Sequence, residues 1–324
     1  MNILVTGGAG YIGSHMTRYL VKNGLRPVVL DNLVYGHRES LPDSVKFYQG
    51  DIADQRLVSK IIRREKIQAV MHFSAYAYVG ESVENPAKYY DNNFCKTARL
   101  LETLREHSVK YFIFSSTCAT YGLQDVPKIN EQLPQNPINP YGFTKLAVER
   151  LLQDYSRAYG LQYAALRYFN AAGADEQGLS GESHNPETHL IPLALQSILR
   201  PRQQLKIFGA DYPTPDGTCV RDYVHVYDLA AAHLKALDYI VQNQISDCFN
   251  LGSENGYSVK EIIQACEKIS GQKTNWVSAP RRAGDPAYLV ADAAKARKIL
   301  GWQTVYDLDK IIATAWQWEQ KRRY

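Results

Sequence analysis

The sequence has few cysteines, little net charge and no long apolar run. Five cysteines among 324 residues include no closely spaced pair, so the sequence predicts neither a disulfide framework nor a zinc site, and we expect no bound metal. The formal net charge of +4 is too small to indicate a nucleic-acid partner. No segment approaches the about 20 apolar residues of a membrane-spanning helix, and no secretory leader is evident, which favours a cytoplasmic protein without a membrane partner.

Short apolar runs alternate with helix-length amphipathic segments in the first half of the chain. This alternation is typical of an α/β fold, here a Rossmann-type doubly wound parallel sheet with helices on both faces. The expected strands are 3–6, 28–30, 45–48, 69–73, 111–115 and 163–167, and the expected helices are 11–23, 55–64, 89–106 and 141–159.

The alternation weakens after residue 172, where loops rich in Gly, Pro, Asp and Asn follow. We therefore predict a dinucleotide-binding Rossmann domain over 1–172 and a smaller mixed α/β substrate domain over 173–324, with the segment around 222–246 returning to the first. Within the smaller domain, Ser258 and Glu261 have the spacing of a capping box.

A glycine-rich segment stands where the first expected strand passes into the first expected helix. Gly7, Gly10 and Gly13 permit a tight turn, and the start of the helix offers N–H groups and a positive dipole end to a pyrophosphate. Asp31 ends the second expected strand, where a carboxylate accepts hydrogen bonds from adenosine ribose hydroxyls and repels a 2′-phosphate. The pattern predicts a site for NAD rather than NADP.

Two further strand ends belong to the same expected crevice, because a doubly wound sheet binds ligands beyond the carboxyl ends of its strands. Gly50, Asp51 and Ile52 are predicted to lie at the adenine, and Phe73, Ser74 and Ala75 to line the path of the dinucleotide. Either segment alone is equally compatible with an ordinary loop.

Three polar side chains form the expected catalytic group. Tyr141 and Lys145 lie one helical turn apart, and a neighbouring ammonium together with a cationic nicotinamide would favour the phenolate of Tyr141. Thr117 follows the fifth expected strand and brings its hydroxyl to the same crevice. The Tyr/Lys pair alone is as compatible with a surface contact, but the three groups together predict a proton-transferring site.

The sequence resembles the extended short-chain dehydrogenase/reductase family, and its nucleotide-sugar epimerases in particular, over essentially the whole chain. Segments 116–121 and 184–189 are similar to a bacterial branch that feeds exopolysaccharide synthesis. The motifs that carry the resemblance are 6–13, 79–82, 90–93, 115–122, Tyr141 with Lys145, 167–170, 216–218, 221–223 and 280–282.

The resemblance implies an isomerase that 4-epimerises UDP-glucose and UDP-galactose reversibly through a 4-keto intermediate, with NAD as its cofactor. Tyr141 would be the base, Lys145 its activator and Thr117 its hydroxyl partner. A homodimer through helices 89–106 and 141–159 is also implied, although apolar faces there suit a core equally well.

The resemblance also implies contact residues for the two ligands. Further cofactor contacts are Tyr11, Ile12, Asn32, Asn92, Ser115, Lys145 and Tyr168. Further contacts to the UDP-sugar are Phe169, Asn170, His189, Leu190, Arg221, Tyr223, Arg282, Asp285 and Leu289, with Leu205, Lys206, Ile207 and Phe208 near the uracil.

Alternatives differ in chemistry. A 4,6-dehydratase needs an Asp-Glu pair after the threonine, where this chain has Cys118 and Ala119. Epimerisation of UDP-xylose and UDP-arabinose stays open, as does added activity on UDP-N-acetylglucosamine, since Leu289 is smaller than the tyrosine of strict relatives. A non-catalytic NAD-sensing protein is disfavoured by the retention of all three catalytic groups.

Overall fold

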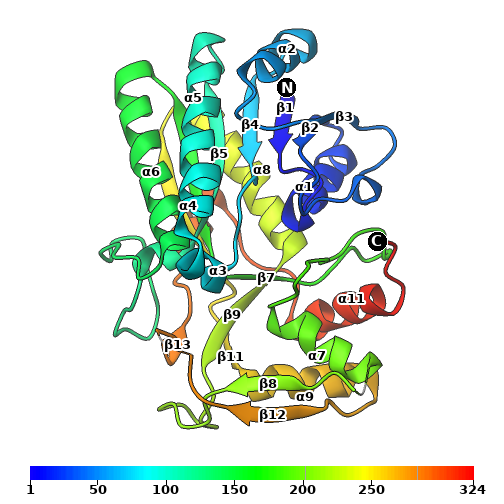
Figure 1. The fold of residues 1–324 in the computed structure, drawn as a ribbon. Helices are drawn as coiled ribbons and strands as arrows, with labels where there is room; N and C mark the ends of the chain where they lie inside the picture. Colours follow the sequence, from blue (N-terminus) through cyan, green and yellow to red (C-terminus); the bar gives the residue numbers. More distant parts are fainter. Residues whose placement is uncertain (201, 283) are drawn as a thin grey trace.

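A seven-stranded parallel sheet forms the larger layer of the molecule (Figure 1). The structure is a computed structural model and describes residues 1–200, 202–282 and 284–324. The strand order is β10-β6-β5-β4-β1-β2-β3. The chain adds β2 and β3 on one side of β1, and then adds β4, β5, β6 and β10 on the other side. This order confirms the predicted Rossmann-type, doubly wound sheet and leaves a crevice beyond the carboxyl ends of β1 and β4.

Six of the seven strands occupy the predicted segments. β5 runs two residues further than predicted and includes Thr117, whereas β10 was missed because its sequence alternates polar and apolar residues only briefly. The bounds are Asn2–Thr6 for β1, Arg26–Asp31 for β2, Lys46–Gln49 for β3, Ala69–His72 for β4, Tyr111–Thr117 for β5, Gln162–Tyr168 for β6 and Asp247–Leu251 for β10.

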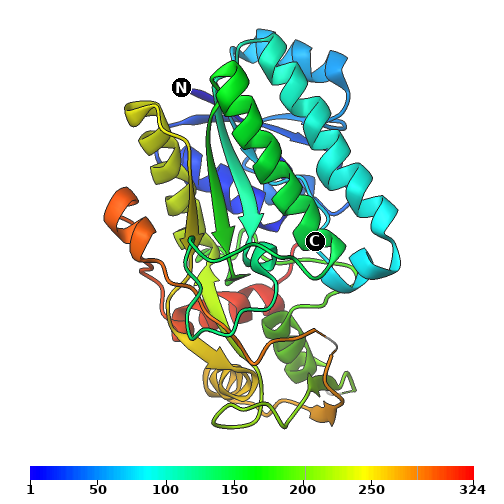
Figure 2. The same ribbon diagram turned by 90° about the vertical axis from the view of Figure 1, so that its left-hand side faces the viewer.

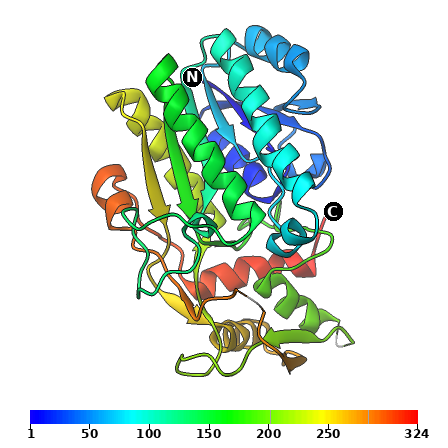
Figure 3. The ribbon, with the colours of Figure 1, turned by 60° about the vertical axis from the view of Figure 1, so that its left-hand side comes forward.

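Helices cover both faces of this sheet (Figures 1 and 3). α1 (Tyr11–Lys22) and α8 (Val226–Asn243) lie on one face, and α2 (Gln55–Glu65), α5 (Lys96–Glu106) and α6 (Pro140–Tyr159) lie on the other. Successive strand residues point to opposite faces, so both faces need apolar side chains. The continuous apolar runs predicted as strands meet that need.

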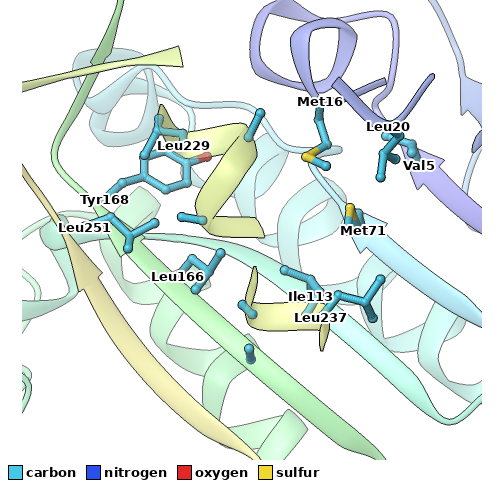
Figure 4. Close-up of a cluster of buried hydrophobic side chains, with 14 of the residues drawn as sticks. Val5, Met16, Leu20, Met71, Ile113, Leu166, Tyr168, Leu229, Leu237 and Leu251 are labelled. Atoms are coloured by element: carbon cyan, nitrogen blue, oxygen red, sulfur yellow. The ribbon is translucent and has the colours of Figure 1, made fainter. Parts of the chain in front are cut away.

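Apolar side chains of the large sheet pack against α1 and α8 in one core. Figure 4 shows Met16 and Leu20 of α1 beside Val5 and Met71 of the sheet, with Leu166 further along. All five side chains are completely buried. The large sheet and these two helices therefore share one continuous apolar core.

The predicted helix over 89–106 is divided in the structure. α3 (Val79–Glu84) and α4 (Pro86–Tyr89) precede a π-helical segment, η2 (Tyr90–Cys95), which leads into α5. Within η2 the Asn93 amide accepts a hydrogen bond from the Tyr76 N–H and donates one to the Tyr76 carbonyl, each at 2.9 Å. The wider turn of η2 thus pins the loop that follows β4, and π-helical turns often occur beside functional sites.

The smaller layer lies below the carboxyl ends of the large sheet (Figure 2). Its helices are α7 (Leu190–Leu199), α9 (Val259–Ser270) and α11 (Leu308–Gln320), and the predicted capping box of Ser258 and Glu261 at the start of α9 is confirmed. Its strands are β7 (Asn170–Ala172), β9 (Val220–His225), β11 (Gly256–Ser258) and β13 (Tyr288–Leu289) in one sheet, and β8 (Leu205–Phe208) and β12 (Trp276–Ala279) in another. Three short helices elsewhere in the chain are η1 (Arg38–Ser40), η3 (Cys118–Tyr121) and α10 (Ala294–Leu300).

The chain crosses between the two layers more than once. After β9 it returns to the large sheet as α8 and β10, and the expected return segment 222–246 contains all of α8 but not β10. Across the described ranges, every helix is too short or too polar to cross a membrane.

Leu166→Ala tests the shared core. Leu166 is completely buried, and removing its branched end leaves a cavity, so we expect a loss of about 2–5 kcal/mol in the free energy of unfolding. Urea denaturation followed by circular dichroism measures it. Val305→Ala is the control because Val305 is 82% exposed, and it should change stability by less than about 0.5 kcal/mol. Equal effects of the two substitutions would contradict this core.

Candidate active site

A cleft lies beyond the carboxyl ends of β1, β2, β3 and β4. Ten of the predicted cofactor residues line it: Gly7, Gly10, Asp31, Asn32, Asp51, Ile52, Phe73, Ser74, Ala75 and Asn92. Gly50, also expected at the adenine, lines the cleft too, and sequence reasoning missed four lining residues: Val34, Tyr35, Gly36 and Tyr76. The only sign of these residues in the sequence was that they lie close to predicted cofactor residues such as Asn32 and Ala75.

The glycine-rich turn is sterically suited to a pyrophosphate. Gly7 has a φ of +69°, and a Cβ on Gly13 would lie only 2.1 Å from the Gly7 carbonyl oxygen, so a side chain at either position would open the turn. Gly10 caps α1, and the first N–H groups of a helix have no acceptor within it. These N–H groups and the positive end of the helix dipole fit an anionic group in the cleft.

Asp31 is fixed at the wall of the cleft. One carboxylate oxygen accepts the Ala9 N–H at 2.9 Å and the other accepts the Leu33 N–H at 2.8 Å. Burial raises the pKa of Asp31, and these backbone hydrogen bonds lower it. The carboxylate therefore keeps one orientation, as recognition of a ribose diol requires.

Two expected cofactor residues beside the turn are used by the fold itself. The Tyr11 hydroxyl donates to the Gly173 carbonyl at 2.6 Å, which ties the start of α1 to the chain after β7. Ile12 packs against the core under α1. Neither side chain lines the cleft, so any contact they make with the cofactor is through the backbone.

Thr117, Tyr141 and Lys145 meet where β5 ends. Thr117 is the last residue of β5 and is buried, and its hydroxyl is hydrogen-bonded to Tyr141. The Lys145 Nζ lies 6.0 Å from the centre of the Tyr141 ring and donates to the Ser115 carbonyl at 2.8 Å. The Ser115 hydroxyl in turn bonds the Tyr168 hydroxyl.

Burial shifts the pKa values of Tyr141 and Lys145 in opposite directions. Burial raises the pKa of Tyr141 above its usual value, and the Thr117 hydrogen bond lowers it. Burial also lowers the pKa of Lys145 to about 7. Burial disfavours the charged forms of both groups. The expected lowering of the tyrosine pKa depends on the lysine and a cationic nicotinamide together, and it stays a prediction.

A buried ion pair that the sequence did not reveal supports α6. Arg167 Nη2 lies 2.6 Å from Glu149 Oε2, and both side chains are at least 96% buried. Glu149 also accepts the Ser116 hydroxyl at 2.5 Å. Arg167 also donates a hydrogen bond of 2.8 Å to the Tyr121 hydroxyl, and that hydroxyl donates one of 2.7 Å to Asn250. The network joins α6, β5, β6, η3 and β10.

The predicted sugar-side residues fall in two groups. Phe169 and Leu289 pack in a small cluster with Cys118, directly after Thr117. Asn170 opens β7, beside Tyr223 of β9, and its amide donates to the Asp222 carbonyl at 2.9 Å. The first group therefore lies beside the end of β5, and the second lies at the edge of the smaller layer.

The predicted diphosphate and uridine residues lie in the smaller layer. Arg221 of β9 is beside Leu289 of β13 and forms an ion pair of 3.3 Å with Asp285. The Arg282 guanidinium stacks on the Phe208 ring, 3.9 Å from its centre. These contacts hold two cationic side chains and an aromatic ring in fixed positions.

Four expected substrate contacts have side chains that also make contacts within the protein, and their roles toward the substrate stay predictions. Leu205, Ile207 and Tyr223 are buried in the core of the smaller layer, so of β8 only Lys206 and Phe208 turn outward. His189 directs its Nδ1 toward Glu182 at 2.7 Å. Leu190 begins α7 directly after it and is partly buried.

Comparisons with known proteins show which family the chain resembles in sequence and in structure. Residues 3–252 match the model of the NAD dependent epimerase/dehydratase family. The chain is 51% identical to a UDP-glucose 4-epimerase of Streptococcus mutans, over 98% of this chain and 96% of the relative, and 52% identical to one of Lactobacillus helveticus, over 99% and 97%. The structure of UDP-glucose 4-epimerase from Brucella ovis in complex with NAD superposes with a TM-score of 0.95 at 50% identity and covers 97% of both chains.

Glu149→Gln tests the buried network. The substitution leaves the Arg167 guanidinium buried without its counter-charge, so we expect about 3–5 kcal/mol of lost stability, measured by chemical denaturation. Asp309→Asn is the control because it removes one partner of the exposed Lys268–Asp309 pair, which should cost less than about 1 kcal/mol. Similar losses in both variants would refute a structural role for the network.

Proposed function

The chain belongs to the NAD dependent epimerase/dehydratase family, and on this basis we propose that it interconverts UDP-glucose and UDP-galactose by inverting the sugar at C4. The observation that carries the proposal is the meeting of Thr117, Tyr141 and Lys145 at the end of β5, beside a cleft suited to a dinucleotide. NAD held in the cleft lined by Gly7, Asp31 and Ser74 would supply the reversible hydride acceptor that epimerisation at C4 needs.

The three side chains divide the proton chemistry. Tyr141 accepts the proton of the C4 hydroxyl, and Thr117 holds that hydroxyl by a hydrogen bond. Lys145 lies close enough to stabilise the phenolate as it forms. Because burial raises the pKa of Tyr141, the Lys145 ammonium and a cationic nicotinamide would have to lower it for Tyr141 to act as a base.

The UDP moiety is assigned to the smaller layer. Arg221 and Arg282 offer the fixed fork of donors that suits a diphosphate, and Asp285 can accept from ribose hydroxyls. Stacking on Phe208 keeps the Arg282 guanidinium oriented. The sugar then extends toward Phe169 and Leu289, which pack in one cluster with Cys118, the residue after the catalytic threonine.

The residue after Thr117 supports epimerisation over dehydration. Cys118 occupies the position where a 4,6-dehydratase needs an acid, and burial raises the pKa of its thiol to about 12. A thiol that stays neutral at physiological pH cannot exchange protons at C5 or C6. Return of the hydride to C4 is then the reaction that we expect of the 4-keto sugar.

Two properties of the assembly complete the proposal. We propose a homodimer through the outer faces of α5 and α6, and a cytoplasmic location. Phe143 and Tyr159 of α6 are 48% and 58% exposed, and Tyr90 contacts Phe143, so these helices carry aromatic surface that a second copy would cover. Light scattering of the purified protein measures the assembly.

The function is tested by incubating the protein separately with UDP-galactose, UDP-xylose and UDP-N-acetylglucosamine and separating the products by chromatography. We expect rapid conversion of UDP-galactose to UDP-glucose. Preferential turnover of UDP-xylose would favour the pentose epimerase, and no turnover of any substrate would favour an NAD-binding protein without catalysis.

Tyr141→Phe should lower turnover of UDP-galactose by about 10²–10⁴-fold, the range for loss of a general base, while NAD stays bound. As a control, Tyr159→Phe removes a tyrosine hydroxyl at the exposed end of the same helix, and this variant should convert UDP-galactose at the normal rate. A fully active Tyr141→Phe variant would exclude Tyr141 as the base.

Leu289 is expected to set the space around the C2 substituent of the sugar. Leu289→Tyr adds bulk beside Cys118 and Phe169, so the ratio of kcat/KM for UDP-N-acetylglucosamine to that for UDP-galactose should fall at least about 10-fold. Leu289→Met keeps a similar volume and should leave the ratio unchanged. The assignment fails if the tyrosine variant keeps the original ratio, or if the unmodified protein does not accept the acetylated sugar.

A further inference from the structure

Four side chains with metal-binding groups converge in the segment between β7 and α7. Glu182, His184, Glu187 and His189 each place one ligand atom within 4.8 Å of the others. We propose that this His/Glu cluster binds one divalent transition metal, and that zinc fits it best. The inference is independent of the epimerase reaction.

The distances between the ligand atoms suit a tetrahedral ion. The His189 Nδ1 lies 2.7 Å from the Glu182 carboxylate and 2.9 Å from that of Glu187. The His184 Nδ1 lies 3.2 Å and 3.8 Å from the same two carboxylates. Ligands bound tetrahedrally to zinc at about 2.0–2.1 Å are about 3.3 Å apart, and the four distances fall on both sides of that value.

The types of donor select the class of metal. Two imidazoles and two carboxylates match zinc and its neighbours in the first transition row. Calcium and magnesium prefer sites made of oxygen atoms alone. The cluster contains no cysteine, so the spacing of the cysteines in the sequence does not indicate it.

A buried oxygen aimed into the cluster lacks a hydrogen-bond partner. The Glu187 side chain is only 6% exposed. Its Oε1 accepts the N–H groups of Thr188 at 2.8 Å and His189 at 2.9 Å, whereas its Oε2, like the His184 Nδ1, forms no hydrogen bond with any residue in the described ranges. The backbone thus orients one oxygen and leaves the other for a metal, as outer hydrogen bonds do for metal ligands.

The cluster can exchange protons for a metal without a change in its net charge. Two imidazolium groups and two carboxylates are neutral together. Two neutral imidazoles, two carboxylates and one dication are neutral as well, so neither state leaves an uncompensated charge in the interior.

The position of the cluster indicates a structural role for the metal. The His184 ring meets the Tyr11 ring edge-on at 6.3 Å and the Tyr78 ring at 5.9 Å, and His189 caps α7. A metal here joins the start of α7 to the chain segment that rests on the start of α1. It would therefore brace the smaller layer against the glycine-rich turn.

Zinc binding to the purified full-length protein tests the proposal. The protein is stripped with EDTA, dialysed against zinc chloride and desalted, and the metal is counted by elemental analysis. We expect about one zinc per chain and a rise in the thermal unfolding midpoint when zinc is added, because a ligand of the folded state stabilises it.

Two variants and a matched control localise the metal. Glu187→Gln keeps an oxygen for the two backbone N–H groups but loses its charge, and His184→Ala removes one nitrogen, so each should bind zinc at least about 10-fold more weakly. His107→Ala removes an imidazole from the turn after α5 and should bind like the unmodified protein. Less than about 0.1 zinc per unmodified chain would overturn the proposal whether or not the variants fold, and so would equal affinity in folded Glu187→Gln.

Discussion

The buried pair of Glu149 and Arg167 is the interaction on which the arrangement of the site depends. Glu149 lies one helical turn beyond Lys145 in α6, and Arg167 immediately precedes Tyr168 in β6. Two charges held in the interior are tolerable only when they remain together, so helix and strand have one possible alignment. That alignment sets where the tyrosine and lysine of α6 meet the end of β5.

Much of the fold could be predicted because its signals are local. The apolar runs of the sheet, the glycine-rich turn and Asp31 are each legible within a few residues, and the cleft is lined by ten of the predicted cofactor residues. The missed strand β10 is short and partly polar. It joins the sheet because β6 offers it a partner, which is information that lies far away in the chain.

The parts of the site that could not be predicted depend on burial and on distant partners. Spacing places Tyr141 and Lys145 together, but it does not show that burial raises the pKa of the tyrosine. The resemblance implies that His189 contacts the sugar, but it does not reveal the contacts of its ring with Glu182 and Glu187. The His/Glu cluster did have a local signal, since its four members lie within eight positions of one another.

Three consecutive hydroxyl residues end β5, and each has a different partner. Ser115 bonds Tyr168, Ser116 bonds Glu149 on the opposite face, and Thr117 bonds Tyr141. A strand alternates its side chains between its two faces, so a shift of one residue exchanges them. The three hydroxyls are consequently not interchangeable: inserting or deleting a single residue in β5 would present a scaffold hydroxyl to the substrate and bury the catalytic one.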